Sequence, residues 1–147
     1  MKTIVQEDTV KLLRECDAGA KMGVASIDDV LNYVYSDKLK DSLSQSKNSH
    51  EQIVKEIEVM LSEYREEGKE PNPIAKGMSW MKTNVKMSFD DSDKTVANLI
   101  TDGCNMGVKS LNKYLNQYEG AADDSKNIAK RLIKLEEELA SSVRSYL

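Results

Sequence analysis

The stretch Met22-Gly23-Val24-Ala25-Ser26-Ile27 decides the fold, because the chain repeats it as Met106-Gly107-Val108-Lys109-Ser110-Leu111. The two copies lie 84 positions apart, and another glycine precedes each repeated glycine by four positions, as Gly19 and Gly103. Both halves of the chain therefore carry a Gly-x-x-x-Gly pair. This internal repeat predicts two structurally related halves within one domain.

The surroundings of both glycine pairs have the apolar spacing of helices. A glycine in a helix interior costs about 1 kcal/mol relative to alanine, so four cost roughly 4 kcal/mol of a usual stability of about 5–15 kcal/mol. Glycines four positions apart share one helix face and allow another backbone to approach. We therefore expect the two repeat-bearing helices to cross closely at their glycines, with no room for a metal pair between them. The alternative is that the glycines are tolerated and have no packing partner.

Composition indicates one soluble helical domain. The 147 residues are 39% hydrophobic and 31% charged, with a mean hydropathy of −0.56 and only two prolines. The formal net charge of −4 disfavours nucleic acid and anionic membranes as partners. The chain has no run of 18 apolar residues, and its first residues do not resemble a signal peptide, so we expect a cytoplasmic protein.

Apolar residues recur every three or four positions through most of the chain. This spacing predicts helices over 4–35, 37–67, 73–87, 92–119 and 123–146. Ser36 is expected to cap the second helix and Gly68 to end it, while Asp123 or Asp124 caps the last helix.

The first helix carries a feature that would allow a break. Ser26 and Asp29 resemble a capping box just after Gly23, which would start a new helix there. The second copy of the repeat has Lys113 at the position equivalent to Asp29, so it lacks that acid. We therefore favour a continuous helix and keep the break as the alternative.

The apolar faces of the second and last helices identify candidate core residues. His50 and Ser46 interrupt the face of the second helix, which is otherwise formed by Leu39, Leu43, Ile53, Ile57, Met60 and Tyr64. We interpret His50 as a core histidine that is hydrogen-bonded to a neighbour such as Ser46. The last helix is expected to bury Ile128, Leu132, Leu135, Leu139 and Val143. Glu136, Glu137 and Glu138 are expected on its solvent side.

Together these elements predict an all-α four-helix bundle made of two helical hairpins. A long crossover that carries the short fifth helix joins the hairpins. If a pseudo-twofold axis relates the two copies of the repeat, the helices over 4–35 and 92–119 lie side by side and antiparallel.

Three stretches of the chain are distinctive: Pro71-Asn72-Pro73-Ile74-Ala75-Lys76, Ser79-Trp80-Met81 and Ile100-Thr101-Asp102-Gly103-Cys104-Asn105-Met106-Gly107. They resemble a group of uncharacterised bacterial ferritin-like proteins from spore-forming Firmicutes. With the helix layout, the resemblance covers nearly the whole chain. It implies a ferritin-like four-helix bundle, and it implies no particular activity because the role of that group is not known.

The ferritin-like resemblance raises the question of a di-iron site. Such sites use a glutamate from each of two helices and a Glu-x-x-His from each of the other two. This chain has one histidine, His50, and the residue three positions before it is Lys47. The sequence therefore predicts no metal and no cofactor. If a metal binds, the candidate ligands are His50, Glu15, Asp17 and Asp102.

No nucleophile–base pair, phosphate-binding loop or basic aromatic groove stands out in the sequence. We therefore expect a non-enzymatic bundle that acts through self-association, with a dimer favoured, or through another protein partner. The alternative is a degenerate metal-binding ferritin-like protein that serves iron storage or oxidative-stress defence. Redox sensing through Cys16 or Cys104 is weaker, because both cysteines are expected to be reduced and buried.

Overall fold

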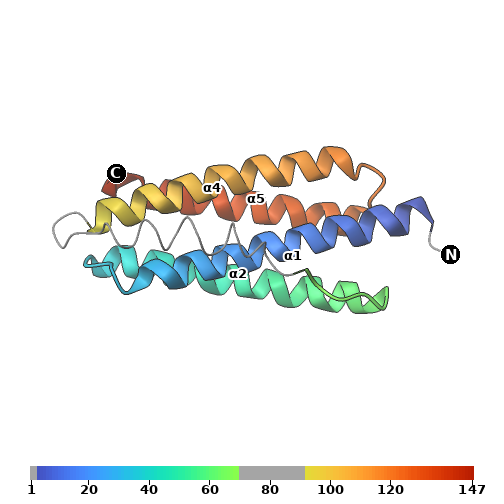
Figure 1. Cartoon of the computed structure of the whole chain (residues 1–147), viewed down its shortest axis with the longest axis horizontal. Helices are drawn as coiled ribbons and strands as arrows, with labels where there is room; N and C mark the ends of the chain where they lie inside the picture. The colour runs from blue at the N-terminus through green and yellow to red at the C-terminus, as the bar shows by residue number, and fades with distance from the viewer. Residues whose placement is uncertain (1–2, 70–91) are drawn as a thin grey trace.

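The computed structural model describes residues 3–69 and 92–147, and within these ranges every regular element is helical (Figure 1). The elements are α1 (Ile4–Leu31), α2 (Asp37–Glu63), α4 (Ser92–Gln117), α5 (Asp123–Val143) and a 3-10 turn, η1 (Arg144–Tyr146). The helix predicted over 73–87 lies outside the described residues. The described chain is a four-helix bundle, as the sequence predicts.

Helix directions follow the expected pair of hairpins. Figure 1 shows α1 and α5 running one way along the bundle and α2 and α4 running the other way. The hairpin partners α1–α2 and α4–α5 pack together, and α1 also packs against α4. The two helices that carry the repeat are therefore neighbours and antiparallel, which confirms that part of the prediction.

α1 is continuous through the repeat, so the break after Gly23 does not occur. A capping box starts the helix: Thr3 Oγ1 accepts from the Gln6 backbone N–H at 3.2 Å, and Gln6 Oε1 accepts from the Thr3 N–H at 2.9 Å. α1 ends at Leu31 rather than at residue 35.

The start of α2 is confirmed and its end is not. Ser36 Oγ accepts from the Leu39 N–H at 3.2 Å, as a cap should. The helix ends at Glu63, and Arg65 adopts a left-handed φ of 57°, so Gly68 does not end it. The early turn brings the Lys69 N–H within 3.0 Å of Asp17 Oδ2, which fixes the end of this segment to α1.

α5 starts at Asp123 as predicted, but its cap differs from the prediction. Ala122 is the N-cap, and Asp123 and Asp124 lie in the first turn instead, where their charges favour the positive end of the helix. Ser125 Oγ donates to the Ala122 carbonyl at 2.6 Å. α4 ends at Gln117 and α5 at Val143, both slightly earlier than predicted.

The hydrophobic core consists of two clusters, one toward each end of the bundle. One cluster includes Leu12, Leu13, Cys16, Ala20, Ile53, Ile57, Leu61, Leu111 and Leu132. The other includes Ile27, Val30, Leu39, Leu43, Val96, Ile100, Cys104, Leu139 and Val143. In each helix the two clusters are separated by a short interval at mid-length, and this interval contains Gly23, His50, Gly107 and Glu136.

Candidate functional site

These four residues, one from each helix, form what we call the polar layer of the bundle. His50 is fully buried and Glu136 is 7% exposed. His50 lies between the buried residues Ser46 and Ile53 of α2, and Glu136 between Leu132 and Leu139 of α5. The alternating spacing of four and three is that of residues that face a helical partner, so both ionisable groups point into the bundle.

His50 and Glu136 join the two hairpins directly. His50 Nε2 lies 2.5 Å from Glu136 Oε1, and His50 Nδ1 lies 2.8 Å from the Ser46 carbonyl oxygen. A carbonyl only accepts, so Nδ1 carries a proton and a second proton must lie between Nε2 and Oε1. The pair is therefore either imidazolium with carboxylate or imidazole with carboxylic acid. The predicted bond between His50 and Ser46 is confirmed.

The repeated glycines make room for this pair. A Cβ atom on Gly23 would lie 2.5 Å from His50 Cδ2 and 2.6 Å from His50 Nε2. A Cβ on Gly107 would lie 3.3 Å from Glu136 Oε2. The prediction that these glycines serve a close crossing of α1 and α4 is therefore wrong, because the space beside them is filled by side chains from α2 and α5.

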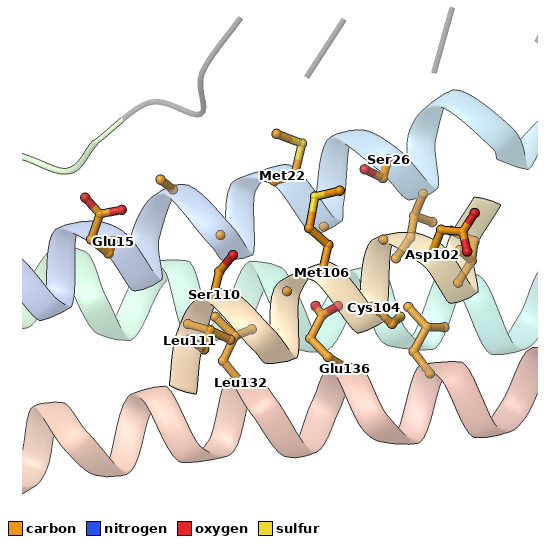
Figure 2. A pocket seen from close by; sticks show the side chains of 18 of the residues that line it. Glu15, Met22, Ser26, Asp102, Cys104, Met106, Ser110, Leu111, Leu132 and Glu136 are labelled. Carbon is orange, nitrogen blue, oxygen red and sulfur yellow. The ribbon is translucent and has the colours of Figure 1, made fainter. Parts of the chain in front are cut away.

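Between α1 and α4 the structure leaves a cavity of about 650 Å³, which also contradicts the expected close crossing. We call this cavity the α1–α4 groove (Figure 2). Its two walls are formed by equivalent positions of the repeat: Gly19, Met22, Gly23 and Ser26 of α1, and Gly103, Met106, Gly107 and Ser110 of α4. Leu132, Glu136 and Leu139 of α5 line it as well, and Figure 2 shows Glu136 reaching from α5 toward α4.

The sequence-based ligand candidates do not come together. His50 is in the polar layer, while Glu15 Oε1 pairs with Lys69 Nζ at 2.5 Å. Asp17 is buried, and its Oδ2 lies 2.7 Å from Lys21 Nζ. Asp102 is exposed and lines the groove. The structure thus gives Glu15 and Asp17 lysine partners and, among the described residues, groups neither of them with His50 in a possible metal site.

A di-iron site does not fit this arrangement. Within residues 3–69 and 92–147, no group of three or more His, Cys, Asp or Glu side chains could hold a metal ion. Both ring nitrogens of His50 are within hydrogen-bonding distance of oxygens, so neither has a lone pair directed at an open site. The described residues therefore provide no set of ligands for a di-iron centre.

Both cysteines are buried, as predicted. Burial raises the pKa of the Cys16 thiol to about 12, with smaller contributions from the charges of Glu15 and Asp17. Burial also raises the pKa of the Cys104 thiol, and the neighbouring Glu136 raises it further. Because the thiolate is the reactive form, neither cysteine suits nucleophilic or redox chemistry.

Glu136 is the site residue that the sequence reasoning missed, since it was expected on the solvent side. Its spacing from Leu132 and Leu139 indicates an inward position, because residues four and three apart share a helix face. Leu135, which was expected in the core, is only partly buried. A buried face of α5 that contains Leu132, Glu136 and Leu139 is therefore already consistent with the sequence, and it places Glu136 inside the bundle.

Comparisons with protein-family models, curated proteins and solved structures found no match to this chain. Among the described helices, none has both the length and the apolar content that crossing a lipid bilayer requires.

Proposed function

We propose that this protein is a non-catalytic helical bundle that binds another polypeptide, a second copy or a different protein, in its α1–α4 groove. We further propose that the fold is ferritin-like and the protein cytoplasmic. The parallel directions of α2 and α4 support the ferritin-like assignment, since a long connection between hairpins gives that arrangement (Figure 1).

The observation that carries this proposal is the groove itself. Its volume of about 650 Å³ is within the range of protein binding sites, and apolar and glycine residues dominate its walls. Met106, one of the lining residues, is 67% exposed, although most large apolar side chains in the described chain are buried. An apolar groove is the kind of surface that binds a partner, whereas a single exposed apolar residue such as Val59 is not.

The polar layer supports a structural rather than a catalytic role. Both nitrogens of His50 are committed within the protein, and the ring is fully buried, so it has no nitrogen to offer a substrate. The nearby Cys104 thiol has a raised pKa. General acid–base or nucleophilic catalysis needs a group within reach of the substrate, and these groups do not provide one.

The alternative, a degenerate metal protein for iron storage or oxidative-stress defence, has less support because the candidate ligands are dispersed. Elemental analysis of protein purified without chelator distinguishes the two. We expect less than stoichiometric transition metal. One or more Fe, Mn or Zn ions per chain would favour the metal protein.

A photo-crosslinking residue at position 106 tests the binding function. We expect light to join this variant to a discrete polypeptide, either a second copy in purified protein or another protein in cells. The matched control places the crosslinker at Val59 of α2, which is 63% exposed and does not line the groove. Equal adducts from both positions, or no adduct from position 106, would contradict the proposal. Light scattering on the purified protein then separates self-association from binding of a different partner.

A further inference from the structure

The shape of the α1–α4 groove suits a helix. Along α1 its lining extends from Glu15 to Ile27, which corresponds to about 18 Å at 1.5 Å per residue. This length matches about three turns of helix. The outer glycines of the two walls, Gly19 and Gly103, let a helix backbone approach closely, and the flexible methionines Met22 and Met106 adapt to its side chains.

The charges that line the groove select among possible occupants. Among the described residues that line it, the charged ones are the acids Glu15, Asp102 and Glu136 and one base, Lys69. Lys69 Nζ lies 2.5 Å from Glu15 Oε1, so these two charges offset one another. The remaining acids are Asp102, which is exposed, and Glu136, which is buried and directs its Oε1 toward His50. The groove is thus apolar with an excess of acidic groups.

A second copy of the chain fits these charges poorly. In a twofold dimer the same surface patch is used by both subunits, so two copies of this groove would bring together two patches with the same acidic excess. Like charges placed together across an interface cost several kcal/mol. A basic partner meets no such penalty.

We propose that the groove binds an amphipathic helix of a different protein, with apolar residues on one face and a lysine or arginine that reaches Asp102. This inference rests on the proposed binding function and names the partner by its chemistry. The apolar face contacts Met22, Met106 and the glycines, as in other helix-in-groove complexes. The basic side chain pairs with the exposed carboxylate of Asp102.

The test uses the full-length protein and two designed helical peptides. Both carry the same apolar face and a hydrocarbon staple on the opposite face, because helices this short are marginal in water. One has a central lysine on the edge of the apolar face, and the other has glutamate at that position. Fluorescence anisotropy measures the affinity of each. We expect the lysine peptide to bind about tenfold more tightly or better, and the preference to shrink in high salt.

Charge reversal at the groove supplies the matched control. Asp102→Lys is expected to reverse the preference between the peptides. Asp41→Lys changes the net charge equally on an exposed part of α2 that does not line the groove, and is expected to leave the preference unchanged. If both substitutions act alike, the preference reflects net charge and the proposal is overturned.

The other outcomes separate this inference from the proposed function. Equal binding of both peptides at the groove overturns the basic-helix assignment and leaves the binding function standing. Failure of both peptides, with crosslinks from position 106 only to a second copy, makes self-association the function and overturns the inference. Crosslinks from position 106 to residues 70–91 of the same chain overturn both proposals, because the groove would then be occupied by the protein itself.

Discussion

The two halves of the bundle carry the same motif and use it differently. In the first hairpin the repeated glycine, Gly23, lies against the imidazole of His50, and in the second Gly107 lies against the carboxyl group of Glu136. The first helices of the hairpins carry the repeated sequence, whereas the second helices present a base in one case and an acid in the other. If the two halves were identical, two histidines or two glutamates would meet in the polar layer. Because one half has His50 and the other has Glu136, a hydrogen bond between these side chains can join the halves.

The halves also differ in how closely a neighbouring side chain packs against the repeated glycine. A Cβ at Gly23 would be 2.5 Å from a ring carbon of His50, and one at Gly107 would be 3.3 Å from a carboxyl oxygen of Glu136. The His50 ring is fixed by contacts at both nitrogens, whereas the glutamate side chain has more rotatable bonds. The first half is therefore less able to accommodate a side chain at its repeated glycine.

The largest expected effect comes from breaking the pair between the halves. Glu136→Leu removes the partner of a fully buried His50 nitrogen, and His50→Leu removes the partner of the buried carboxyl group. Loss of one member of a buried pair costs about 3–5 kcal/mol, so we expect either variant to lose about that much free energy of unfolding in urea titrations. A loss below about 1 kcal/mol would mean that the pair does not join the halves.

The double variant, His50→Leu with Glu136→Leu, is the control for that experiment. Replacing both members of a buried pair by apolar side chains is often nearly neutral. We expect the double variant to be more stable than either single variant. Strictly additive losses would indicate that each residue contributes only by its own packing.

The sequence predicted the four-helix bundle and one of the two contacts of His50. Apolar periodicity identified the four described helices, the lack of an acid at Lys113 favoured a continuous α1, and the four-residue spacing gave Ser46 as the neighbour of His50, because these features depend on residues close together in the chain. The partner of His50 is 86 positions away, and that contact depends on the packing of the hairpins. The role of the glycines was mistaken for the same reason, since a small residue shows that space is needed but not which side chain fills it.

The next largest effect is expected at the repeated glycines. Gly23→Ala forces the His50 ring to move, and overpacking of this kind costs about 1–3 kcal/mol. Gly107→Ala requires only a small shift of Glu136, so its cost should be clearly lower. Thermal unfolding of both variants measures the difference. Equal losses would show that the two halves are equally rigid at this layer.

Substitution of Gly19 is expected to have the smallest effect on stability, and to raise it rather than lower it. It precedes Gly23 by one helical turn, but a Cβ placed there would meet, among the described residues and apart from nearby backbone of its own helix, only Leu132 Cδ2 at 3.9 Å, an ordinary contact. Because alanine is the better helix former, Gly19→Ala should raise stability by about 0.5–1 kcal/mol. The rise would show that only the glycine in the polar layer is required for packing. A loss comparable to that of Gly23→Ala would instead mean that both glycines of α1 meet a close neighbour, and the assignment of Gly23 to His50 would lose its basis.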